Sequence, residues 1–69
     1  MEQFSVPFFE ENFRTYTEQN KDVFDKQQAM NSYYVSMVST LINDNINKNS
    51  EIVKRVRNLN TAYQNVRSK

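Results

Sequence analysis

The chain has 69 residues, 38% of them hydrophobic, and contains one proline but no glycine, cysteine, histidine or tryptophan. Disulfides and thiolate or imidazole metal sites are therefore excluded. Tight hairpins and phosphate-cradling loops are disfavoured, because their backbones usually need glycine. The composition predicts one small all-α domain of marginal stability, because a chain of this length buries only about 60% of its unfolded surface.

The formal net charge is only +1, but the charges are unevenly distributed. Residues 1–35 hold six acidic and three basic residues, whereas residues 36–69 hold two acidic and six basic residues. This asymmetry is typical either of a basic segment that binds nucleic acid or of two chains with opposite ends together. No apolar stretch approaches the roughly 20 residues that span a bilayer, and the start of the chain lacks a basic leader. Both signs of charge occur on the polar face, so we expect a soluble cytoplasmic protein without a membrane partner.

The first predicted element is a helix over about residues 6–19. Ser5 precedes it as an N-cap, and Pro7 lies in the first turn, where its missing N–H costs nothing. Spacings of three and four residues place one set of apolar side chains on a single helical face. These residues are Val6, Phe9, Phe13 and Tyr16.

The second predicted element is a long helix over about residues 25–66, which follows a turn over about 20–24. Four apolar residues are separated by eleven positions each time, a repeat that keeps one helical face nearly straight. They are Met30, Leu41, Ile52 and Tyr63.

Residues 43–50 decide between two architectures, because they are rich in asparagine and aspartate, which favour caps and turns. If this stretch breaks the helix, Ser50 caps a third helix and the chain forms a compact three-helix fold. If it continues, the chain is a hairpin of one short and one long helix. We expect continuation, because apolar residues keep recurring and neither glycine nor proline interrupts them.

A long second helix predicts a homodimer. The first helix would be about 21 Å long and the second about 60 Å, so half of the second would lack cover within its own chain. Burying each apolar side chain there is worth about 1.5–3 kcal/mol, which favours pairing with a second copy. The expected interface residues are Leu41, Ile52, Val56, Leu59, Tyr63 and Val66. We therefore expect an all-α, two-helix hairpin that forms a homodimeric helical bundle, with an antiparallel crossing that sets acidic halves against basic halves.

Three segments are similar to a known family. They are FSVPFFEENF at residues 4–13, AMNSYYVSMVSTL at residues 29–41 and NLNTAYQNV at residues 58–66. With them the chain resembles the YvfG family of small bacterial proteins over nearly its whole length. The resemblance implies a two-helix monomer that pairs into a homodimer. It supplies no catalytic residue, because the family has no assigned biochemical function.

The residues indicate no enzyme. The carboxylates near the predicted helix starts have ordinary roles in capping and in favouring the helix dipole. No spacing matches a calcium loop, and no histidine or cysteine is present to activate a serine or threonine. We therefore expect no catalytic residue, no metal and no cofactor.

The chain is expected to act as a protein–protein interaction or adaptor module, with itself or another protein as partner. The alternative is a nucleic-acid-binding helical dimer, because phosphate contacts need only accessible basic side chains. The candidate contacts are Lys54, Arg55, Arg57 and Arg67. Lys54 and Arg57 lie together at i, i+3, whereas Arg55 points elsewhere, and a solvated polar face is the competing interpretation.

Overall fold

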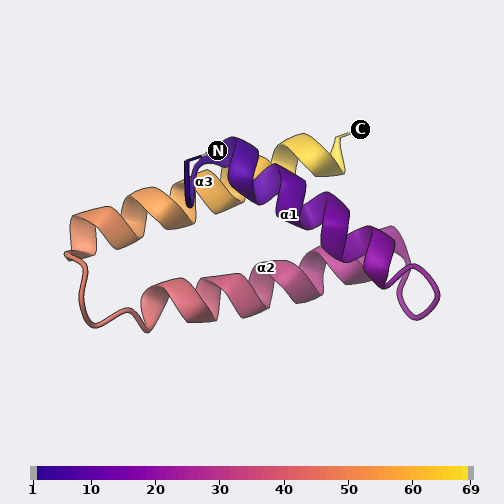
Figure 1. Cartoon of the computed structure of the whole chain (residues 1–69), viewed down its shortest axis with the longest axis horizontal. Coiled ribbons are helices and arrows are strands. Elements are labelled where there is room, and N and C mark those ends of the chain that lie inside the picture. Colours follow the sequence, from indigo (N-terminus) through magenta and orange to yellow (C-terminus); the bar gives the residue numbers. More distant parts are fainter. Residues whose placement is uncertain (1, 69) are drawn as a thin grey trace.

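Three helices make up the fold of residues 2–68, which are the residues that a computed structural model describes (Figure 1). They are α1 (Val6–Gln19), α2 (Lys26–Ile42) and α3 (Asn49–Arg67). Helices α2 and α3 run antiparallel and are joined by a loop at one end of the long axis, and α1 packs against both of them. The molecule measures 38 × 20 × 18 Å.

Helix α1 has the same bounds as the first predicted helix, and local hydrogen bonds explain both ends. The Ser5 side chain accepts a hydrogen bond from the Phe8 N–H at 3.3 Å, as an N-cap does. At the other end, the Asn20 side-chain amide donates to the Tyr16 carbonyl at 2.8 Å. This bond satisfies one of the carbonyl groups that a helix end leaves without a partner.

Helix α2 begins with a capping box. The Gln28 N–H donates to Asp25 Oδ1 at 2.8 Å, and the Asp25 N–H donates back to Gln28 Oε1 at 3.1 Å. This reciprocal pair satisfies two N–H groups that the first turn cannot bond internally. The loop between α1 and α2 therefore ends at Asp25.

The predicted two-helix hairpin is wrong, because the chain breaks between α2 and α3. The Asp44 carboxylate accepts hydrogen bonds from the N–H groups of Ile46, at 2.7 Å, and Asn47, at 3.1 Å. These bonds compete with the carbonyl partners that a continuing helix would supply. The same correction applies to the two-helix monomer that the resemblance implies. The three-helix alternative is confirmed, although Lys48 and not Ser50 occupies the N-cap position of α3.

The core lies where the three helices meet, and every buried side chain of the described residues is apolar. It consists of Phe9, Phe13, Met30, Leu41, Leu59, Ala62 and Val66. Aromatic rings close its sides, with centroid distances of 4.8 Å between Phe13 and Tyr33 and 5.1 Å between Tyr34 and Tyr63. The apolar face of α3 is thus covered by α1 and α2 of its own chain. The shortage of cover from which we predicted a homodimer does not arise, because the loop folds α3 back onto α2.

Candidate functional site

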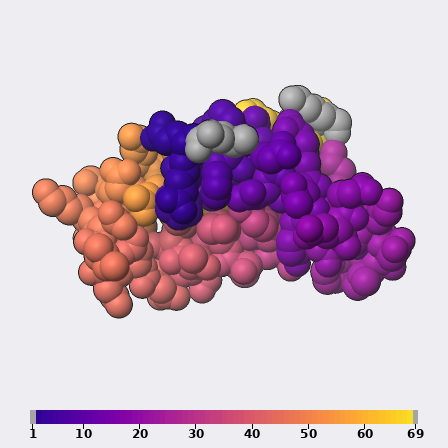
Figure 2. All heavy atoms as spheres, in the orientation of Figure 1, coloured from indigo at the N-terminus to yellow at the C-terminus, as the bar shows by residue number. Residues whose placement is uncertain are grey.

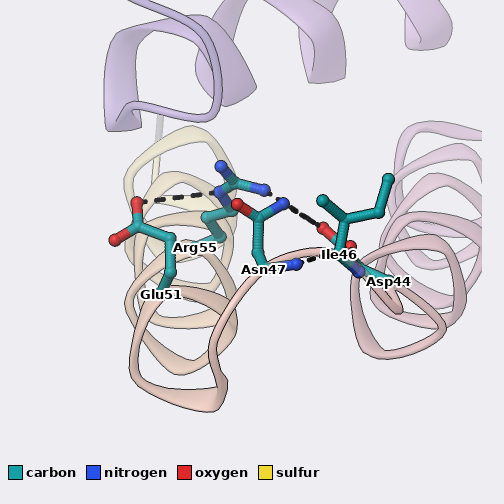
Figure 3. Close-up of polar contacts among 5 residues, drawn as sticks. All are labelled: Asp44, Ile46, Asn47, Glu51 and Arg55. Carbon is teal, nitrogen blue, oxygen red and sulfur yellow. Dashed lines mark hydrogen bonds and ion pairs between the residues drawn. The ribbon is translucent and has the colours of Figure 1, made fainter.

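Arg55 contacts Asp44, Glu51 and Phe4 near the α2–α3 loop, and Figure 3 shows its contacts with the two acidic residues. Its Nη1 atom lies 3.4 Å from Asp44 Oδ2, and its Nε atom lies 3.8 Å from Glu51 Oε1. Its guanidinium carbon also lies 4.6 Å from the centroid of the Phe4 ring, a cation–π distance. The Arg55 side chain is only 20% exposed. Arg55, predicted as a nucleic-acid contact, is therefore engaged within the protein.

Phe4 reaches Arg55 through an unusual backbone conformation. Its φ angle of 63° lies in the left-handed region, which residues other than glycine rarely adopt. The Asn58 side-chain amide donates to the Phe4 carbonyl at 3.1 Å, and the Phe4 ring packs 5.7 Å from Phe8 and 6.0 Å from Phe9. Such contacts hold a strained residue in place. They fix the segment before α1 over the first half of α3.

The α2–α3 loop is ordered around one carboxylate. Asp44 accepts the two backbone bonds described above and a third bond from the Asn47 side-chain amide. The Asn47 side-chain bond, then the two backbone bonds, and least of all the Arg55 charge, hold the pKa of Asp44 below its ordinary value of 3.8. Within this ordered loop the Ile46 side chain is 94% exposed.

Aliphatic side chains line the flanks on which α2 and α3 meet. The Tyr63 hydroxyl donates to Asn31 at 2.8 Å and the Tyr34 hydroxyl to Asn60 at 3.5 Å, so Asn31 and Asn60 lie on the facing flanks. Residues four and seven positions along a helix share a flank. By this spacing the flanks also carry Val35, Val38, Ile42, Val53 and Val56, which we call the aliphatic seam.

Much of the aliphatic seam is open to solvent. Val35 is 67% exposed, Ile42 58% and Val53 50%. No charged residue occurs anywhere in the segment 27–43, so α2 places only polar uncharged groups beside these side chains. The seam was not identified from the sequence. The signal that could have revealed it was the absence of charged residues over residues 27–43, in a chain that is otherwise rich in charge.

The structure does not bring the four predicted nucleic-acid contacts together. Lys54, Arg57 and Arg67 are exposed, and among residues 2–68 none of them forms an ion pair. Arg55 instead turns toward Asp44. Arg67 lies ten residues beyond Arg57 on the same helix, a separation of roughly 15 Å. Nucleic-acid binding stays a prediction, with Lys54 and Arg57 as its remaining adjacent pair.

Five of the six residues predicted at a subunit interface lie in or against the core of their own chain, and the sixth, Ile52, is partly buried. Three are buried, namely Leu41, Leu59 and Val66, and three are partly buried, namely Ile52, Val56 and Tyr63. Tyr63 also accepts a hydrogen bond from the Gln27 side chain at 2.7 Å, within the same chain. Self-association through these residues stays a prediction, and their burial does not require it.

Few groups in the described residues are arranged for chemistry. Within residues 2–68 no group of three or more acidic residues is placed to hold a metal ion. A surface hollow between α1, the start of α2 and the end of α3 has a volume of about 220 Å³, below the roughly 300–1,000 Å³ of small-molecule sites. A second hollow at the α2–α3 loop has about 440 Å³ but is lined mainly by polar and charged residues. Tyr33 has a buried hydroxyl without a hydrogen-bond partner in this part of the chain. Burial raises the pKa of Tyr33 above its ordinary value of 10.0.

Comparison with known proteins matches this chain to one family. Residues 2–69 match the family model described as YvfG protein. The chain is also 48% identical, over 66 residues, to a Bacillus subtilis (strain 168) protein named "Uncharacterized protein YvfG". That alignment covers 96% of this chain and 90% of the relative. In the described residues, no helix combines the length and apolar character needed to cross a membrane.

The family model and the Bacillus subtilis relative both match nearly the whole chain. The chain therefore belongs to the YvfG family.

Proposed function

We propose that this protein is a non-enzymatic interaction module of the cytoplasm that binds another polypeptide through its aliphatic seam. The observation that carries this proposal is the exposure of Val35, Ile42 and Val53 on facing flanks of two antiparallel helices. Apolar side chains gathered on one face mark interaction sites. Helix α1 packs on the same helix pair elsewhere, so a helix from a partner could pack along the seam in a similar way.

The chemistry of the chain supports a binding role over a catalytic one. The sequence contains neither histidine nor cysteine, the usual partners of an activated nucleophile. The seam itself consists of aliphatic side chains, which supply contact area but no reactive group. On the α2 side of the seam no charged group loses its water when the seam is covered, whereas on the α3 side Arg57 lies four residues beyond Val53.

Site-specific photo-crosslinking in cells tests the proposal. A photoreactive amino acid in place of Val35 or Val53 should yield protein adducts larger than the monomer. The same substitution at Glu11, an exposed residue of α1, is the matched control and should yield few. An absence of protein adducts at both seam positions would contradict the proposal.

Self-association is measured separately, by sedimentation equilibrium of the wild-type chain. If the partner is a second copy of this chain, sedimentation should show a dimer, and Val35→Ser should weaken its formation. A monomer together with crosslinks to a different polypeptide identifies a heterologous partner. Seam-dependent dimerisation and heterologous crosslinks both assign binding to the seam.

A further inference from the structure

Ile46 is the most exposed large hydrophobic residue of the described chain, and the loop that carries it is ordered. Its side chain is 94% exposed, while its N–H is bonded to Asp44 Oδ1 at 2.7 Å. Asp44 is held in turn by the Asn47 side chain and by Arg55 (Figure 3). The loop therefore presents an isoleucine to solvent in a defined position. Contact between this apolar side chain and water is unfavourable in free energy, and insertion into an apolar medium would remove that cost.

The segment that surrounds Ile46 in the sequence has an excess of basic residues. Residues 43–57, which we call the loop end, contain four basic and two acidic residues. Both acidic residues, Asp44 and Glu51, contact Arg55. The other three basic residues, Lys48, Lys54 and Arg57, are exposed and form no ion pair within residues 2–68. The loop end thus combines a protruding aliphatic side chain with unpaired positive charge, which suits an anionic partner.

The opposite end of the molecule (Figure 1) has an acidic loop, although Arg14 and Lys26 line a hollow with Glu18 there. Its loop, between α1 and α2, carries Val23, which is 75% exposed. Residues 18–25 contain three acidic residues and one basic residue, and that base, Lys21, lies 2.8 Å from Glu18. The chain thus provides an internal comparison, in which an exposed aliphatic residue has acidic instead of basic neighbours.

The shape of the loop end favours a lipid surface over a folded protein. The α2–α3 loop forms one tip of the long axis, and α1 does not extend over it (Figures 1 and 2). The tip lies within transverse extents of 20 × 18 Å, whereas each partner buries about 800 Å² of accessible surface in a stable protein interface. A bilayer needs no shape complementarity, because an apolar side chain inserts at the interface and basic side chains bind anionic headgroups.

We propose that the loop end docks reversibly on anionic phospholipid surfaces. Ile46 enters the boundary between headgroups and acyl chains, and Lys48, Lys54 and Arg57 lie against the lipid phosphates. The sequence alone argued against a membrane surface, because both signs of charge occur on the polar face. The structure changes that balance, because it engages Asp44 and Glu51 with Arg55 and leaves the other basic residues free. The loop end shares Val53 and Val56 with the aliphatic seam, but the residues proposed to contact lipid, Ile46, Lys48, Lys54 and Arg57, are not seam residues.

Vesicle co-sedimentation of the full chain tests this proposal. We expect binding to vesicles of mixed phosphatidylglycerol and phosphatidylcholine, and much weaker binding to vesicles of phosphatidylcholine alone. Binding should fall steeply at about 0.5 M NaCl, where the Debye length is only about 4 Å. Lys48→Gln and Lys54→Gln should each weaken binding about fivefold. Arg67→Gln, far along α3 from the loop, is the matched control and should have a smaller effect.

Substitution of the exposed aliphatic residues separates the two ends of the molecule. Ile46→Ser should weaken vesicle binding about tenfold, because the inserted apolar group is lost. Val23→Ser removes a similarly exposed side chain at the acidic end and should leave binding unchanged. Circular dichroism checks that both variants fold. The proposal is overturned if anionic vesicles are not bound at low salt, or if the two variants bind equally.

Fluorescence gives a second measurement that does not depend on affinity. The chain has no tryptophan, so Ile46→Trp introduces a single reporter. Its emission should shift to shorter wavelength when anionic vesicles are added, whereas that of Val23→Trp should not. An unchanged Ile46→Trp spectrum in the presence of bound vesicles would contradict insertion.

Crosslinking at Val35 in the Ile46→Ser background shows whether the seam still binds a polypeptide, so failure of docking and failure of the proposed function remain distinguishable.

Discussion

Leu59→Ala tests whether the core is built within one chain. The Leu59 side chain is 0% exposed in the core shared by the three helices. Replacing such a leucine by alanine costs about 2–5 kcal/mol, because apolar contacts are lost and a cavity remains. A domain of this length has a total stability of roughly 3.5–10 kcal/mol, so the change removes a large fraction of it.

Urea denaturation followed by circular dichroism measures this loss. With a denaturant slope of about 1 kcal/mol per molar urea, the unfolding midpoint should fall by about 2 M or more. Val53→Ala shortens a half-exposed side chain in the same helix and is the matched control, with an expected loss below about 1 kcal/mol. The wild-type midpoint should not change with protein concentration. This prediction would be refuted if the wild-type midpoint rose with protein concentration and the Leu59→Ala midpoint did not. Leu59 would then be buried between chains.

Three further predictions concern the loop and the buried hydroxyl. Arg55→Met should cost about 0.5–1 kcal/mol through its lost contact with Phe4, and should speed amide exchange at Ile46, whereas Lys54→Met should do neither. Because the pKa of Asp44 is lowered in the folded chain, its contribution to stability is complete above about pH 3.8 and is lost as the pH falls further. The stability difference between wild type and Asp44→Asn in urea should therefore shrink below pH 3.8, and a constant difference would refute this account. Tyr33→Phe removes a buried hydroxyl without a partner and should leave thermal stability unchanged or higher; a loss above about 1 kcal/mol would reveal a hydrogen bond to that hydroxyl.

The exposed basic residues illustrate how far the sequence alone predicts the candidate site. Helical spacing placed Lys54 and Arg57 together on a polar face, and both are exposed in the structure. The same spacing separated Arg55 from them and is compatible with its contact to Glu51, but it did not indicate the partners of Arg55 outside α3. Those partners are Asp44, eleven residues away, and Phe4, on a separate segment. Contacts between distant residues depend on how the chain folds back, which local periodicity does not describe.

The sequence by itself determined the helical class, both ends of α1 and the start of α2, but not the break between α2 and α3. Ser5 and Asp25 cap α1 and α2 through side-chain bonds to N–H groups three residues ahead, a preference that local chemistry alone sets. The apolar stripe, which consists of Met30, Leu41, Ile52 and Tyr63, identified which faces of the later helices point toward the core. These features depend on residues a few positions apart, so a linear sequence contains them.

Only the tertiary structure decided what covers that stripe. Apolar residues eleven positions apart suit one straight helix, but they suit two antiparallel helices equally well when the break preserves the apolar face of each. Asp44 ends the helical bonding pattern locally, and the return of α3 then brings Tyr63 within 5.1 Å of Tyr34. Periodicity shows that a helical face is apolar. Which segment packs on that face depends on the total free energy of contacts between segments that are distant in the sequence.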